Sequence, residues 1–149
     1  MAHIHKKILI HAPVDKVYAL ARDPKHWNAW WVGLSEPEKI EGKGEKGTIV
    51  KHHYALAGMD FPVTSRVVQD DADPKEAHWK GEIEGPLEGK QEWTYKAKGK
   101  DTEVETEINY TVPGKAIGKL VDRLIIEKMQ ERSTEHTLEN LKLLCEAQA

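Results

Sequence analysis

The chain has 149 residues, a length that fits one domain spanning residues 1–149. Its 22 Lys and Arg residues against 25 Asp and Glu residues give a formal net charge of −3, with both signs mixed along the sequence. This balance gives no general attraction to nucleic acid or to an acidic lipid surface. No apolar run approaches the roughly 18 residues of a membrane span, and the single Cys145 cannot form an internal disulfide. We therefore expect a cytoplasmic protein with no nucleic-acid partner and no stable membrane insertion.

Residues 3–31 predict one strand followed by two short helices. In residues 3–12 (HIHKKILIHA), isoleucines recur at even spacings, which is typical of a half-buried strand. Pro13 and Pro24 suit the first turn of a helix, and Asp23 supplies a capping carboxylate before the second. The second helix carries three tryptophans on one face: Trp27, Trp30 and Trp31. We expect this aromatic face to be buried, because the helix lacks the basic face of a membrane-surface helix.

Residues 34–112 change to an apolar period of two. Turn signals separate six strand-like runs in this region. Short turns between successive strands are typical of an antiparallel meander. The last run, residues 102–112, is the clearest, because one face is apolar or threonine and the other is mostly glutamate. We predict that residues 34–112 form one antiparallel sheet, with the first strand at its edge or paired with the last.

A long helix is predicted from about residue 115 to residue 146. Its apolar stripe is rich at both ends, but between residues 127 and 137 the only large apolar side chain is Met129. Two explanations remain open: the middle of the helix faces solvent, or it spans a cavity. In the second case, four residues at helical spacing would face the cavity: Ile125, Met129, Arg132 and His136.

This order of elements resembles the START-like, helix-grip superfamily (SRPBCC), and within it the polyketide cyclase/dehydrase and lipid-transport branch. The resemblance rests on ILIHAPVDKVYALARDPKHWNAWW (8–31), EGKGEKGT (41–48) and LENLKLLCE (138–146). It implies an α+β fold in which a curved antiparallel sheet of about seven strands surrounds a long C-terminal helix. Two short helices would follow the first strand, and an apolar cavity open at one end would lie inside.

The leading functional interpretation is the binding of a small, largely apolar or amphipathic molecule with a polar end. A lipid, a quinone or a polyketide-like or other aromatic metabolite would be carried or sequestered in a cavity of about 300 Å³ or more. We expect Arg132 to be the principal donor to the polar end, because a guanidinium stays charged when partly buried. The expected ligand-binding residues are Trp27, Trp31, Tyr54, Phe61, Trp79, Trp93, Tyr95, Ile108, Tyr110, Met129 and Arg132.

Two other classes of function remain open. As an enzyme, the chain would be a cyclase or dehydratase, a lyase or isomerase, using His52, Arg132 or His136 for general acid–base catalysis. As an interaction module, it would bind a chaperone or a ribosome. No metal site is predicted, because His52 and His53 point to opposite faces of a strand and no His-x3-His or Cys-x2-Cys spacing occurs. We expect no cofactor, and a monomer or weak homodimer.

Overall fold

The computed structural model describes residues 2–111 and 123–148. Its centre is a curved sheet of seven strands in the order β1-β7-β6-β5-β4-β3-β2, in which every neighbouring pair is antiparallel. Successive strands from β2 to β7 are neighbours, so short turns suffice to join them. The strands are β1 (Ala2–Ile10), β2 (Lys39–Glu41), β3 (Ile49–Leu56), β4 (Met59–Asp71), β5 (Glu76–Glu84), β6 (Glu88–Lys98) and β7 (Asp101–Thr111).

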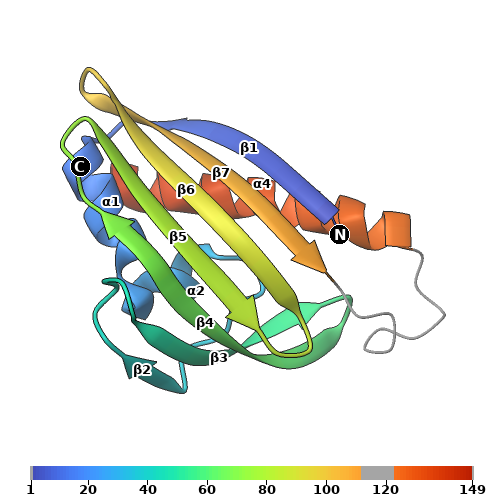
Figure 1. Ribbon diagram of the computed structural model, residues 1–149. Coiled ribbons are helices and arrows are strands. Elements are labelled where there is room, and N and C mark those ends of the chain that lie inside the picture. The colour runs from blue at the N-terminus through green and yellow to red at the C-terminus, as the bar shows by residue number, and fades with distance from the viewer. Residues whose placement is uncertain (1, 112–122, 149) are drawn as a thin grey trace.

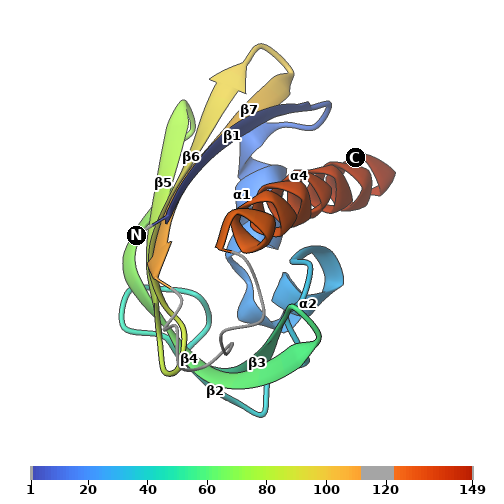
Figure 2. The same ribbon diagram turned by 90° about the vertical axis from the view of Figure 1, so that its right-hand side faces the viewer.

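Helices occupy the concave side of the sheet. The long helix α4 lies within the curve, and α1 and α2 lie on the same side (Figures 1 and 2). Asp23 caps the short turn before α2, accepting a hydrogen bond from the main-chain nitrogen of Lys25 at 3.0 Å. The helical elements are α1 (Val14–Arg22), the 3₁₀ turn η1 (Pro24–His26), α2 (Trp27–Trp30) and α4 (Arg123–Ala147).

The architecture confirms the predicted helix-grip fold. Residues 34–112 were expected to form a single antiparallel sheet, and the strands described within this range do so. Strand β1 is an edge strand paired with β7, with Ile4 opposite Ile108. The C-terminal helix is confirmed from Arg123 onward, whereas the part of that prediction covering residues 115–122 lies outside the described residues.

Buried side chains form two separate clusters. The larger one, here called the tryptophan core, joins α1 and α2 to the sheet and to the C-terminal half of α4. Its members are Ile10, Ala12, Val14, Val17, Tyr18, Ala21, Trp27, Trp30, Val50, Val67, Ala77, Trp79, Trp93, Tyr95, Val104, Leu138, Leu141 and Cys145. The smaller one, the hairpin core, lies where the β3–β4 and β5–β6 turns meet the N-terminal part of α4. Its members are Leu56, Phe61, Val63, Leu87 and Ile126.

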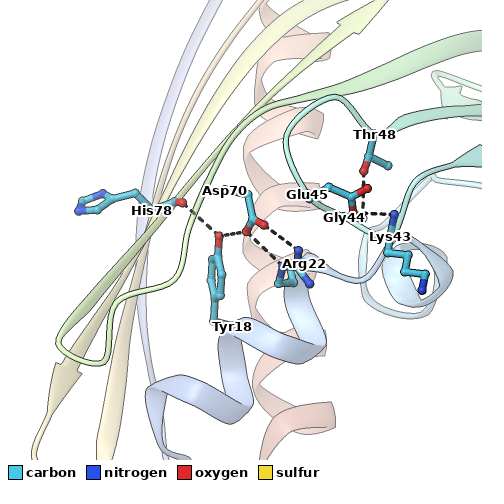
Figure 3. A network of polar contacts seen from close by, with 8 residues as sticks. All are labelled: Tyr18, Arg22, Lys43, Gly44, Glu45, Thr48, Asp70 and His78. Carbon is cyan, nitrogen blue, oxygen red and sulfur yellow. Dashed lines mark hydrogen bonds and ion pairs between the residues drawn. The ribbon is translucent and has the colours of Figure 1, made fainter.

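A polar cluster attaches α1 to β4 (Figure 3). Arg22 donates to both carboxylate oxygens of Asp70, from Nε at 3.1 Å and from Nη2 at 2.6 Å, and the Tyr18 hydroxyl also contacts this carboxylate. Burial, followed by the contact with Asp70, raises the pKa of Tyr18, so its hydroxyl remains a neutral donor. Gly44 packs on the end of α1 with φ +108°, where a Cβ atom would lie 2.4 Å from the Arg22 carbonyl oxygen.

Polar contacts with β1 fix the rotation of α4 about its axis. Lys6 on β1 forms an ion pair with Glu135 at 2.9 Å. About two helical turns after Glu135, the Lys142 ammonium donates to the main-chain oxygen of Leu9 at 2.9 Å. Both contacts lie along the same edge of the sheet. Together with the buried residues of α4, they determine which side of the helix faces the concave surface.

Candidate ligand-binding site

A pocket of about 70 Å³ lies between the concave face of the sheet and α4, partly open to solvent. We call it the helix pocket. It separates the tryptophan core from the hairpin core. Its lining residues are Ile4, Trp31, Tyr54, Leu56, Ile83, Leu87, Glu88, Gly89, Lys90, Gln91, Ile108, Tyr110, Thr111, Gln130, Ser133, Thr134 and Thr137.

The helix side of this pocket consists of short or polar side chains. One face of α4 carries them all, because Ser133 and Thr134 lie three and four residues after Gln130, and Thr137 lies four and three residues after these two. The Thr134 hydroxyl donates to the main-chain oxygen of Gln130 at 2.9 Å, and Thr137 Oγ1 accepts from the main-chain nitrogen of Val32 at 3.0 Å. Because serine and threonine do not reach across to the sheet, they leave the space that larger apolar residues would fill.

The expected inward face of α4 was wrong. Met129 is 41% exposed and His136 is 69% exposed, and the Arg132 side chain is exposed as well. The helix instead turns Ile126 and Leu141 inward, because these side chains bury more apolar surface against the sheet. The expected position of Met129, Arg132 and His136 in the cavity wall, and with it the anchoring of a ligand by Arg132, is therefore corrected.

Two side-chain amides contribute polar groups to the helix pocket. Gln130 Oε1 accepts a hydrogen bond from the Tyr54 hydroxyl at 3.2 Å. Burial raises the pKa of Tyr54, while hydrogen bonds with Gln130 and Trp31 act in the opposite direction. On the sheet side, Gln91 Oε1 accepts a hydrogen bond from Trp93 Nε1 at 2.8 Å. The interior of the pocket therefore offers neutral hydrogen-bonding groups on an apolar background.

A smaller pocket of about 20 Å³, the tryptophan pocket, lies next to the first. Trp31, Ile83 and Gln91 line both pockets and separate them. The remaining lining residues of the tryptophan pocket are Ala21, Trp27, Trp30, Leu34, Ser65, Trp79, Trp93 and Tyr95.

Between α4 and the sheet, as far as the structure describes them, the expected cavity of about 300 Å³ is not confirmed, and the space is divided into pockets of about 70 and 20 Å³. The tryptophan rings fill most of it, because they pack edge to face. The ring centres of Trp30 and Trp93 are 5.6 Å apart, and those of Trp27 and Trp79 are 5.7 Å apart. Aromatic side chains expected to surround a ligand therefore surround one another.

The predicted wall residues fall into groups. Trp31, Tyr54, Ile108 and Tyr110 line the helix pocket. Trp27, Trp79, Trp93 and Tyr95 line the tryptophan pocket. Phe61 belongs to the hairpin core.

Sequence reasoning missed the polar lining. Gln91 precedes Trp93 by two positions in β6, so the alternation of the strand already places it on the inner face. On α4, the spacing of Gln130, Ser133 and Thr137 marks a face as clearly as apolar residues would.

His52 points inward from β3, as expected, and is buried. Its Nε2 lies 2.7 Å from the Ser65 hydroxyl. Burial, with a smaller contribution from the charge of His53, lowers the pKa of His52 to about 4. Because His52 belongs to the lining of neither pocket, the structure places it as a hydrogen-bonded core residue.

A curved antiparallel sheet that grips a long C-terminal helix, with a pocket between them, defines the START-like class of folds. The family "Polyketide cyclase / dehydrase and lipid transport" matches residues 1–146, and the chain belongs to this family. No curated protein matches the chain. Among the described residues, no helix has the length and apolar character needed to span a membrane.

Solved structures share this fold at low sequence identity. TTHA0849 of Thermus thermophilus superposes with a TM-score of 0.79 at 18% identity, over 99% of both chains. A START superfamily protein from Mycobacterium smegmatis gives a TM-score of 0.77 at 11% identity over 100% of both chains. The Zhui aromatase/cyclase from Streptomyces sp. R1128 gives 0.70 at 20% identity, over 97% of this chain and 93% of that one. At these identities the likeness concerns the fold.

Proposed function

We propose that this protein binds a small, largely apolar molecule with a polar group in the helix pocket, and carries or sequesters it without chemical change. One observation carries the proposal: the pocket is left open between an apolar sheet and a polar helix face. Burying an apolar ligand there is favourable by about 25 cal/mol per Å² of apolar surface. Family membership supports the same kind of function.

The volume of the pocket restricts the ligand. About 70 Å³ is enclosed, roughly half of an engineered apolar cavity of about 150 Å³ that holds benzene in another protein. An aromatic ring therefore fits only if part of the ligand stays at the open end, or if Trp31 is displaced from the boundary between the two pockets. A long lipid chain fits this volume less well than a compact aromatic molecule.

The lining favours binding over catalysis. The charged residues among its described lining are Glu88 and Lys90, and their exposed side chains alternate along β6 with the inward-facing Gln91. His52 is outside the lining and is hydrogen-bonded to Ser65. General acid–base catalysis requires a titrating group within hydrogen-bond reach of the reacting atom. The arrangement supplies hydrogen bonds to a ligand instead.

Ethylbenzene is a suitable first probe, titrated into ¹⁵N-labelled protein and followed by amide chemical shifts. We expect residues around the helix pocket to shift in a saturable way. Ser133→Leu fills the pocket and should abolish these shifts. Arg132→Leu adds the same side chain on the exposed face of α4 and should leave them unchanged. Equal binding by Ser133→Leu and the parent protein would show that the pocket is not the binding site.

A further inference from the structure

We propose that the helix pocket selects an uncharged ligand bearing an oxygen acceptor, such as a ketone, over the same skeleton bearing a carboxylate. In this proposal the acceptor oxygen takes hydrogen bonds from the amide nitrogens of Gln91 and Gln130. The inference rests on the proposed function and adds the ligand's chemical class. It replaces the charged anchor expected from the sequence with neutral donors.

The orientation of the Gln91 amide is fixed by its neighbour. Trp93 Nε1 can only donate, so the atom facing it at 2.8 Å must be the amide oxygen. Gln91 Nε2 is thereby turned away from Trp93, and it makes no hydrogen bond with any residue that the structure describes. Gln91 is buried and lines both pockets. Its amide N–H groups are therefore available to donate to an acceptor that enters the pocket.

A second set of donors comes from the opposite wall. The Tyr54 hydroxyl donates to Gln130 Oε1, which leaves Gln130 Nε2 as a donor. Within the described parts of the chain, neither Gln130 Nε2 nor the Ser133 hydroxyl has a hydrogen-bond partner. Both residues line the helix pocket from α4, whereas Gln91 lines it from β6. A ligand oxygen between helix and sheet can therefore accept from either side.

The charges around the pocket disfavour an anion. Lys90 and Glu88 are exposed and alternate along β6 with the inward-facing Gln91, so the Lys90 ammonium is not directed into the pocket. A neighbouring depression that shares Tyr110 and Ile4 with the pocket is lined by the carboxylates of Glu127 and Glu131. A carboxylate entering this interior would lose its hydration, and among the described lining residues it would meet no buried cation. Burial likewise disfavours the charged form of the Tyr54 phenol, which lines the pocket, and so raises its pKa.

Three probes with similar skeletons test the proposal on the intact protein: ethylbenzene, acetophenone and benzoate. At about pH 7 benzoate is ionised and acetophenone is neutral. In NMR titrations, we expect acetophenone to bind about 3- to 10-fold more tightly than ethylbenzene, the range of one neutral hydrogen bond. We expect benzoate to bind at least about 10-fold more weakly than acetophenone, and acetophenone to shift the Gln91 side-chain amide signals.

Gln91→Met preserves the length of the side chain and removes its donors. Acetophenone affinity should fall toward that of ethylbenzene, because one of the two donors is lost, while the affinity for ethylbenzene should not change. Glu92→Met, on the outer face of the same strand, is the matched control and should keep the parent ranking of the probes. If Gln91→Met does not fold, Gln130→Met and the ranking of the probes by the parent protein decide the question.

The possible failures are distinguishable. If none of the probes binds, the proposed function of the helix pocket is wrong, and the inference falls with it. If ethylbenzene binds while acetophenone binds no better, or benzoate binds as well as acetophenone, the pocket is a binding site but its selection of neutral acceptors is overturned. A ranking that survives Gln91→Met and Gln130→Met would also overturn the assigned donors.

Discussion

The tryptophan core and the helix pocket lie under one helix, yet the first is closely packed and the second is left open. Beneath the C-terminal half of α4, Leu138, Leu141 and Cys145 meet the tryptophans of the sheet and of α2. Nearer the N-terminus of the helix, Ser133 and Thr134 face the same sheet and leave the helix pocket. The size of the side chains on the helix therefore decides where a cavity forms.

Truncating a side chain of the tryptophan core should have the largest effect. Trp93 is 1% exposed and lies between the rings of Trp30, Trp31 and Tyr95. We expect Trp93→Ala to lower the free energy of unfolding by about 3–5 kcal/mol in a urea titration. Ile108→Ala, in the wall of the helix pocket, should cost about 2 kcal/mol, because its side chain already borders empty space. An equal decrease in the free energy of unfolding for both variants would show that the tryptophan core and the helix pocket do not differ in packing.

Acid should destabilise the protein through His52, which lies 6.3 Å from Trp27 between ring centres. Its folded pKa is lowered to about 4, whereas the unfolded chain holds histidine near about 6.5. Between these two pKa values the unfolded state binds more protons than the folded state. The contribution of neutral His52 to the free energy of unfolding is therefore complete above about pH 6.5, and it is lost as the pH falls toward about 4. The upper bound of the loss is about 3 kcal/mol.

The comparison protein for this measurement is His52→Gln, which cannot titrate at that position. Urea unfolding at several pH values should show a smaller decrease for His52→Gln than for the parent protein between about pH 6.5 and 4. Parallel curves for the two proteins would mean that water reaches His52 and that this part of the interior is less dry than its burial indicates.

Enlarging a side chain should have opposite effects in the tryptophan core and in the helix pocket. Cys145→Leu adds volume to the tryptophan core, where Cys145 is buried, and should lower the free energy of unfolding by about 1–3 kcal/mol. Ser133→Leu adds volume to open space and should raise it by about 0.5–1 kcal/mol. Both are read from denaturant midpoints. Destabilisation by Ser133→Leu comparable to that of Cys145→Leu would mean that the helix pocket cannot accept an apolar group.

The sheet could be predicted from the sequence because alternation along a strand directly reports which side chains are buried. In β7, Val104 and Thr106 on the inner face are separated by Glu105 on the outer one, as expected. The phase of α4 could not be read in the same way. Met129 is the only large apolar residue in the middle of the helix. The face containing Met129 was therefore predicted to be buried, but Met129 is exposed.

The polar lining and the cavity volume were harder to predict for physical reasons. Ser133 and Thr137 are inward because the helix as a whole is oriented by apolar residues elsewhere along it, such as Ile126 and Leu141, which are buried. The cavity volume depends on the angle between the indole rings of Trp30 and Trp93. A sequence pattern does not determine such an angle. Strand alternation correctly placed Trp79, Trp93 and Tyr95 inside, but it gave no measure of the space between them.

The volume open to a ligand depends on the side chains between the two pockets, which are those of Trp31, Ile83 and Gln91. Ile83 pairs with β4 and β6 through its main chain, so a smaller side chain at this position would join the two pockets while the strand pairing is kept. The same seven-stranded frame can thus serve ligands of different sizes through changes at one internal partition. In an evolving lineage, or in a design experiment, ligand size is then adjustable separately from the stability of the fold.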